Sequence, residues 1–341
     1  MKKLTFMYLL VLILANHVHS QFITNVSKVG TTAAPFLTIG VGARPIGMGG
    51  AFVGVANDAT AIFWNPAGLA RLTKNEAVMT HTNWFIDTKF DFAGLALPLG
   101  NDMGTIGVNI ISLSMGEMKV RTVAEPDGTG ERFGASDLAV GISYARSLTD
   151  RFSIGGSAKY ISQRIWHMSA SSFAIDIGTI FTTRFNDMKI GMCISNFGTE
   201  MKFDGEDLLV FHDIDPEKYG NNDKIPAYLL TERWSLPLTF RVGIAMDILK
   251  EENNRLTVAI DALHPNDNTE SINLGVEYDF SRLMTLRVGY KSMFLRNGEE
   301  GITAGIGLKY DRIGSSLKLD YAYQTFGRLG NVQRLSLGVA F

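Results

Sequence analysis

Hydrophobic and polar positions alternate with a period of two along most of the chain. Near the C-terminus, Leu335, Leu337 and Val339 share one face, whereas polar or small residues occupy the other. Segments 238–248 and 271–280 repeat the pattern. Because successive side chains of a β-strand point to opposite sides of the sheet, this period predicts strands with one apolar face. Strands of about 9–11 residues are long enough to cross a bilayer at a tilt.

The pattern predicts fourteen strands. Their ranges are 76–85, 88–99, 104–114, 135–147, 152–165, 170–184, 188–196, 238–248, 254–263, 271–280, 284–290, 301–310, 315–324 and 333–341. Short polar turns alternate with longer loops, of which 115–134 and 197–237 are the longest, and only the hairpin at Ile86 and Asp87 is short where a long loop is expected. Outer-membrane barrels place short turns in the periplasm and long loops outside. The prediction is therefore an all-β, 14-stranded antiparallel transmembrane barrel. A soluble all-β sandwich also alternates and is the less favoured alternative.

The first 75 residues differ from the rest. Lys2 and Lys3 precede an apolar run over 4–15, and small residues stand before Gln21. This order predicts a cleaved secretory signal over 1–20, with export to the outer membrane of a Gram-negative cell. Residues 21–75 are rich in Gly and Ala without alternation, which predicts a plug of short helices and turns, and 76–341 form the barrel.

Composition excludes several function classes. The single cysteine allows no internal disulfide, and a formal net charge of −2 with interspersed signs argues against nucleic-acid binding. The six histidines are scattered, and no paired Cys/His spacing of a metal site occurs. Gly47 to Gly50 lacks the Lys-Ser/Thr of a phosphate loop, so a tight turn is expected. We therefore expect no catalytic, cofactor-binding or metal site, and membrane lipid as one partner.

Three sequence blocks resemble the PorV/PorQ family. The first is FLTIGVGARPIGMGGAFVGVANDATAIFWNPAGLARL at 36–72. The second is DALHPNDNTESINLGVEY at 261–278, followed by LRVGY at 286–290, and the third is DYAYQTFGRLGNVQRLSLGVAF at 320–341. The resemblance implies a barrel similar to the FadL fatty-acid transporters, which carry an Asn-Pro-Ala motif in a lumenal hatch.

The resemblance also implies a role in type IX secretion. PorV-like barrels receive the C-terminal signal domains of exported proteins and pass them to a surface attachment complex, to which PorQ-like members belong. The first hypothesis is thus a non-enzymatic barrel that binds other type IX components and secreted cargo. The alternative is a FadL-like channel for the uptake of hydrophobic small molecules, with such a molecule as ligand.

Residues of the predicted plug are candidates for a hatch that gates the lumen. Arg44 is expected to pair with an inward carboxylate of Asp176 or Glu277. A simple helix stop at the proline is the alternative interpretation of the motif. The hatch candidates are Arg44, Asn65, Pro66, Ala67 and Gly68.

The 197–237 loop is unusually apolar for a loop outside the barrel. Exposed apolar patches often mark interfaces, although a loop folded into the barrel would have the same composition. The candidates for partner contact are Phe203, Leu208, Leu209, Phe211, Tyr228 and Trp234. His264, Asn266 and Asp267, around Pro265, are further candidates in the next outward loop, with a proline-fixed turn as the alternative.

Overall fold

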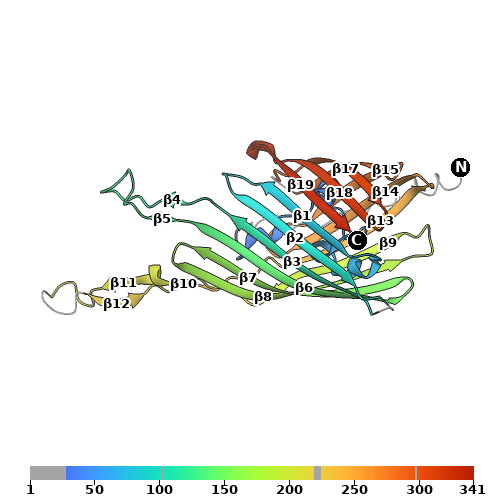
Figure 1. The fold of residues 1–341 in the computed structure, drawn as a ribbon. Helices are drawn as coiled ribbons and strands as arrows, with labels where there is room; N and C mark the ends of the chain where they lie inside the picture. The colour runs from blue at the N-terminus through green and yellow to red at the C-terminus, as the bar shows by residue number, and fades with distance from the viewer. Residues whose placement is uncertain (1–27, 101–102, 219–223, 296–297) are drawn as a thin grey trace.

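The computed structural model describes residues 28–100, 103–218, 224–295 and 298–341. The predicted signal sequence lies outside these residues. Fourteen long antiparallel strands form a closed barrel (Figure 1). They are β1 (Glu76–Asn83), β2 (Lys89–Pro98), β3 (Thr105–Ser114), β6 (Ala135–Thr149), β7 (Phe152–Ile165), β8 (Met168–Thr182), β9 (Lys189–Gly198), β13 (Thr239–Lys250), β14 (Asn254–Pro265), β15 (Ser271–Phe280), β16 (Met284–Met293), β17 (Ile302–Arg312), β18 (Ser315–Thr325) and β19 (Asn331–Ala340).

Pairing of the first and last long strands closes the barrel. β1 pairs with β19 from Glu76 opposite Ala340 onward, and the Phe341 N–H donates to the Asn75 carbonyl at 2.9 Å. The fourteen predicted strands are confirmed, with ends displaced by a few residues. Closure leaves no free sheet edge, which a bilayer demands because lipid offers no hydrogen-bond partners.

The outer surface is apolar and the inner surface is polar or small. On β19, Leu337 is 47% exposed on the outer face, whereas its neighbours Ser336 and Gly338 point inward and are buried. A soluble sandwich has a polar outer surface and an apolar interior, whereas a barrel in lipid has an apolar outer surface, as seen here. Among the described residues, no helix is long and apolar enough to cross a membrane.

Residues 34–72 lie within the barrel, where they form short helices (Figure 1). These are η1 (Pro35–Thr38), α2 (Ala43–Gly47), α3 (Ala61–Trp64) and η2 (Pro66–Arg71). Their apolar side chains form the main core together with residues on the inner faces of the strands. The largest of these buried side chains in the segment include Phe36, Ile46, Met48, Phe52 and Leu69. The core of this barrel is therefore the packing of the N-terminal segment against the wall.

Glycines on the inner faces allow this segment to approach the wall closely. A Cβ at Gly289 would lie 2.2 Å from the Gly49 nitrogen, and one at Gly178 would lie 2.0 Å from Asn65 Oδ1. Only a residue without a side chain leaves room for the Gly49 backbone at the first position and for the Asn65 side chain at the second. The abundant strand glycines thus make room for the segment.

Two long loops on the same end of the barrel carry small strands that project away from it (Figure 1). The first contains β4 (Met118–Lys119) and β5 (Arg132–Phe133). The second contains β10 (Asp204–Gly205), which pairs with the end of β8, then η3 (Glu206–Leu208) and the projecting strands β11 (Leu209–His212) and β12 (Ile225–Tyr228). The turn η4 (Gly327–Leu329) lies in the loop between β18 and β19. We call this the outward end and the opposite end, with short turns, the inward end.

Replacing Leu337 with Arg tests the lipid-facing surface. A charge on the lipid face costs about 2–4 kcal/mol near the bilayer midplane, so we expect weaker insertion and a lower urea midpoint in lipid vesicles. Gln333→Arg, on the same face near the outward rim, is the matched control and should insert normally. Normal insertion of Leu337→Arg would contradict a lipid-facing Leu337.

Replacing Gly178 with Ala tests the packing of the segment. The added methyl group clashes with Asn65 Oδ1, so we expect the segment to become cleavable by trypsin at Arg71 while the barrel stays folded. At Gly156 the nearest atom to an added Cβ is 3.5 Å away, so Gly156→Ala is the control. Equal resistance of both variants to trypsin would argue against close packing at Gly178.

Candidate functional site

Arg44 of α2 joins the N-terminal segment to the barrel wall through a buried ion pair. Its Nε and Nη2 donate to the two carboxylate oxygens of Glu277 on β15, each at 2.8 Å. Its Nη1 donates to Asp58 Oδ2 at 2.7 Å and to Asn57 Oδ1 at 2.8 Å. The predicted pairing with Glu277 is confirmed, whereas Asp176 instead pairs with Lys159 of the wall at 2.8 Å.

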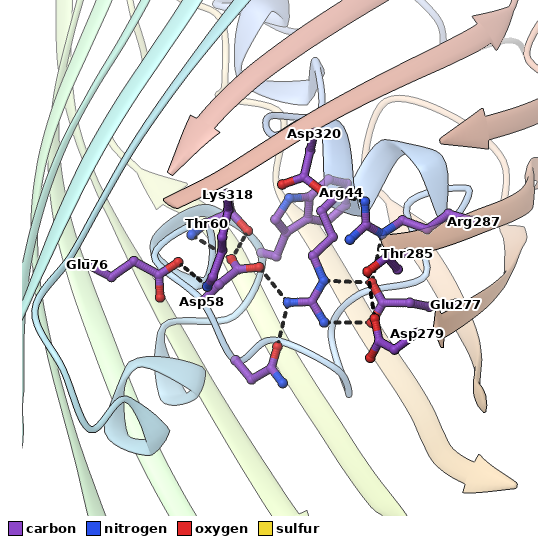
Figure 2. Close-up of polar contacts among 12 residues, drawn as sticks. Arg44, Asp58, Thr60, Glu76, Glu277, Asp279, Thr285, Arg287, Lys318 and Asp320 are labelled. Atoms are coloured by element: carbon purple, nitrogen blue, oxygen red, sulfur yellow. Dashed lines mark hydrogen bonds and ion pairs between the residues drawn. The ribbon is translucent and has the colours of Figure 1, made fainter. Parts of the chain in front are cut away.

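Further charges of the wall extend this pair into a cluster (Figure 2). Arg287 Nε donates to Glu277 Oε2 at 2.7 Å, and Arg287 Nη1 donates to Asp320 Oδ1 at 2.6 Å. Lys318 Nζ donates to Glu76 Oε1 at 2.8 Å. We call Arg44, Asp58, Glu76, Glu277, Arg287, Lys318 and Asp320 the lumenal charge cluster. Opposite charges alternate through it, so each buried carboxylate has a cationic partner.

Both ionised groups that the segment contributes are held in their charged forms. Burial acts to lower the pKa of Arg44, but the neighbouring carboxylates of Glu277 and Asp58 outweigh it and raise the pKa well above its usual value. Burial acts to raise the pKa of Asp58, but Arg44 and Lys318 outweigh it and lower the pKa below its usual value. The attachment therefore persists at neutral pH and weakens only when acid protonates the carboxylates.

A cavity of about 450 Å³ opens beside the lumenal charge cluster near the inward end. The turn between β13 and β14, from Lys250 to Asn254, contributes to its lining, together with Arg282 from the turn between β15 and β16. Most of the residues that line the cavity are charged, with both signs present, or polar. Such a lining suits hydrated or ionic groups and disfavours an apolar molecule.

Asn65 of the Asn-Pro-Ala-Gly motif connects three pieces of backbone. Its Nδ2 donates to the Val53 carbonyl at 3.0 Å and to the Thr179 carbonyl of β8 at 3.1 Å, and its Oδ1 accepts from the Ala67 N–H at 3.2 Å. Pro66 begins η2, and a Cβ at Gly68 would lie 2.3 Å from the Ala56 carbonyl oxygen. The motif therefore ends α3, begins η2 and attaches the segment to the wall.

The apolar 197–237 loop is partly folded in and partly exposed. Phe203 packs against the core, and Leu208 is only 8% exposed. The exposed fraction is 69% for Phe211 and 71% for Tyr228, while Leu209 and Trp234 are about half exposed. Phe203 and Leu208 thus belong to the base of the loop, and the β11–β12 hairpin presents the apolar surface.

The other outward candidates take part in local contacts. His264 Nδ1 lies 3.0 Å from Glu270 Oε1, and Asn266 Nδ2 donates to the Leu236 carbonyl at 3.0 Å. Asp267 Oδ2 accepts from Thr32 Oγ1 at 3.0 Å. These residues therefore shape a turn, and Asp267 also holds the start of the N-terminal segment.

Several members of the lumenal charge cluster were not predicted from the sequence. Arg287, Lys318 and Asp320 stand on inward positions of strands whose other face is apolar. The sequence feature that could have identified them is a charged residue on the inward face of a strand, because charges inside a barrel need partners of opposite sign. The described ranges contain no group of three His, Cys, Asp or Glu side chains suited to a metal ion.

A sequence profile described as type IX secretion system protein PorV matches residues 22–212, which is more than half of the chain. A comparison with curated proteins gives no match.

Solved structures share the fold at low sequence identity. A FadL homologue of Pseudomonas aeruginosa has 14% identity and a TM-score of 0.51, covering 86% of this chain and 97% of its own. The Pseudomonas putida toluene transporter TodX has 12% identity and a TM-score of 0.56, covering 88% and 97%. The CymD monoaromatic hydrocarbon channel has 10% identity and a TM-score of 0.55, covering 89% and 97%.

Replacing Arg44 with Met tests the attachment of the segment. The change leaves Glu277 and Asp58 without a main cationic partner, and breaking a buried pair typically costs about 3–5 kcal/mol. We expect the segment to detach, which planar-bilayer recordings should show as increased ion conductance. The double variant Arg44→Met/Glu277→Gln should recover part of the closed state, because it removes one of the two carboxylates that lose Arg44 and leaves Arg287 paired with Asp320. Conductance unchanged from the wild type in Arg44→Met would contradict this role.

Proposed function

Because the chain belongs to the family of the type IX secretion system protein PorV, we propose that it binds exported proteins in the outer membrane and hands them on to other secretion components. The proposed cargo element is the C-terminal signal domain that PorV-like barrels receive. The protein acts without catalysis in this proposal and reaches the membrane after cleavage of its signal peptide. The match to the PorV profile supports the receiving role.

The observation that carries this proposal is the apolar surface of the outward β11–β12 hairpin. Phe211, Tyr228 and Leu230 are 69%, 71% and 83% exposed, although they lie outside the lipid-facing strands. Aromatic side chains of this kind are enriched in protein interfaces, where a few such residues supply most of the binding energy. A hairpin also offers strand edges to which an extended partner segment can add.

The filled lumen supports a role at the surface rather than a wide open pore. Residues 34–72 pack inside the wall and are held by Arg44 and Asn65. In this proposal the segment 21–75 is a plug that keeps the barrel closed, and 76–341 is the barrel that carries the outward loops. Arg44 and the 65–68 motif serve as the attachment points of this plug.

Uptake of hydrophobic small molecules is the alternative function. Two of the solved structures that share the fold are a toluene transporter and a monoaromatic hydrocarbon channel by their descriptions. Most residues that line the cavity beside the lumenal charge cluster are charged or polar, which does not suit such molecules. The alternative would require altered ligand uptake after substitution of Asn65 or Pro66, which hold the segment in place.

Site-specific crosslinking tests the hairpin as the cargo contact. The only native thiol, Cys193, is buried, so it is first replaced by Ser. In cells, a thiol crosslinker at Phe211→Cys should capture exported proteins that carry C-terminal signal domains. The matched control is Ile313→Cys, which is fully exposed in an inward turn and should capture none of them.

A double variant, Phe211→Ser/Tyr228→Ser, tests the energetics of the same contact. Losing two exposed aromatic anchors should lower the amount of co-purified cargo about tenfold or more. The barrel should retain its wild-type unfolding midpoint, because both side chains lie outside the core. Undiminished cargo, or crosslinks from Ile313→Cys alone, would contradict the proposal.

A further inference from the structure

Arg334 on β19 is a fully buried arginine in the outward half of the lumen. It is only 1% exposed. Its Nη1 donates to Gln324 Oε1 of β18 at 2.8 Å, and its Cζ lies 5.3 Å from the centre of the Trp84 ring. A hydrogen bond on one edge and an aromatic ring against the plane fix the orientation of the guanidinium group.

The remaining edge of this guanidinium group is unpaired. Arg334 Nε and Nη2 have no hydrogen-bond partner among the described residues. Their two N–H groups point the same way and match the two oxygens of a carboxylate. Thr82 is the cross-strand neighbour of Arg334 on β1, and its buried hydroxyl likewise has no partner among the described residues. Three unpaired polar atoms therefore gather on adjacent strands.

The charges around Arg334 leave a positive excess. Gln324 Nε2 donates to Glu300 Oε1 at 3.4 Å, which links Arg334 indirectly to that carboxylate. Glu300 is already engaged directly by Lys291 and by the Ser292 hydroxyl. Two cations thus share one carboxylate in this connected group. A buried cation is stable only when a counter-charge or hydrogen-bond acceptors reach it, so the free edge calls for an acceptor.

Aromatic side chains adjoin the site on its outward side. The Trp84 ring centre lies 4.9 Å from that of Phe85 and 5.5 Å from that of Phe326. These residues come from the hairpin between β1 and β2 and from the start of the loop between β18 and β19. Low polarity around the guanidinium strengthens its attraction for an anion relative to the same contact in water.

We propose that Arg334 and Thr82 form a carboxylate-binding site in the outward half of the barrel, separate from the lumenal charge cluster. The Nε and Nη2 groups of Arg334 bind both carboxylate oxygens, and the Thr82 hydroxyl donates to one of them. The carboxylate belongs either to a free small organic acid or to the C-terminus of a bound polypeptide. The second source rests on the proposed cargo role, whereas the site itself does not.

Unfolding of the full-length protein in detergent, with sodium acetate exchanged for sodium chloride at constant ionic strength, tests the site. A ligand that binds only the folded state raises the unfolding midpoint in proportion to the logarithm of its concentration above the dissociation constant. We expect this rise in the wild type and its loss in Arg334→Lys, which keeps the charge but not the two-pronged edge. Thr82→Val, which preserves shape, should require about tenfold more acetate for the same rise. Arg328→Lys is the matched control, because Arg328 is exposed in the neighbouring loop.

A short peptide with a free C-terminus, compared with its C-terminal amide, distinguishes the two sources. Protection by the free-acid peptide and not by the amide supports the site with a polypeptide terminus as its occupant. Protection by acetate but by neither peptide supports the site with a small organic acid as its occupant. An equal rise in the wild type, Arg334→Lys and Arg328→Lys would show a general solute effect and overturn the proposal. No rise with any carboxylate would mean that water alone satisfies the arginine, which also overturns it.

Discussion

Closure of the sheet between β1 and β19 is the constraint on which the rest of the structure depends. A bilayer offers no hydrogen-bond partners, so every strand needs a neighbour on both sides. Closing fourteen strands into one wall meets that need, and it also encloses a lumen that must be filled or hydrated. The outer face then becomes apolar because it meets lipid, and the inner face is free to carry charges, small residues and glycines.

The N-terminal segment solves the problem that closure creates. Charges such as Glu277 and Arg287 on the inner face would be costly if left unpaired, and Arg44 completes their pairing from within. Glycines such as Gly289 let the segment lie directly against the wall. The segment and the wall are therefore complementary in both charge and shape, which explains why this part of the sequence lacks strand periodicity and is nonetheless buried.

The strands were predictable because each carries its own signal. The alternation over 333–341 specifies which side chains face lipid, and the structure places Leu335 and Leu337 there. The pairing of Arg44 with Glu277 was predicted as one of two possibilities. Alternation shows that the Glu277 side chain points into the lumen, but it does not give the position of Glu277 along the barrel axis relative to α2. Arg287 and Asp320 were missed for the same reason, since their contacts depend on the stagger between strands.

The division of the 197–237 loop into a buried base and an exposed hairpin could not be predicted either. Composition does not show that Leu208 is buried while its neighbour Leu209 is exposed.

The two ends of the barrel differ chemically, and the N-terminal segment connects them. At the outward end the Ala33 N–H donates to the Ser235 carbonyl at 2.9 Å, next to Trp234 at the base of the apolar loop. Thr32 donates to Asp267 in the neighbouring loop, whereas Arg44 binds Glu277 beside the inward cavity. A partner that moves the base of the apolar loop therefore acts on a segment that is also attached at the lumenal charge cluster and, through Asn65, at β8. The buried Arg44–Glu277 pair, the Asn65 hydrogen bonds and the apolar packing of the segment together oppose its release, so a partner outside would have to supply binding energy that exceeds their sum to open the lumen.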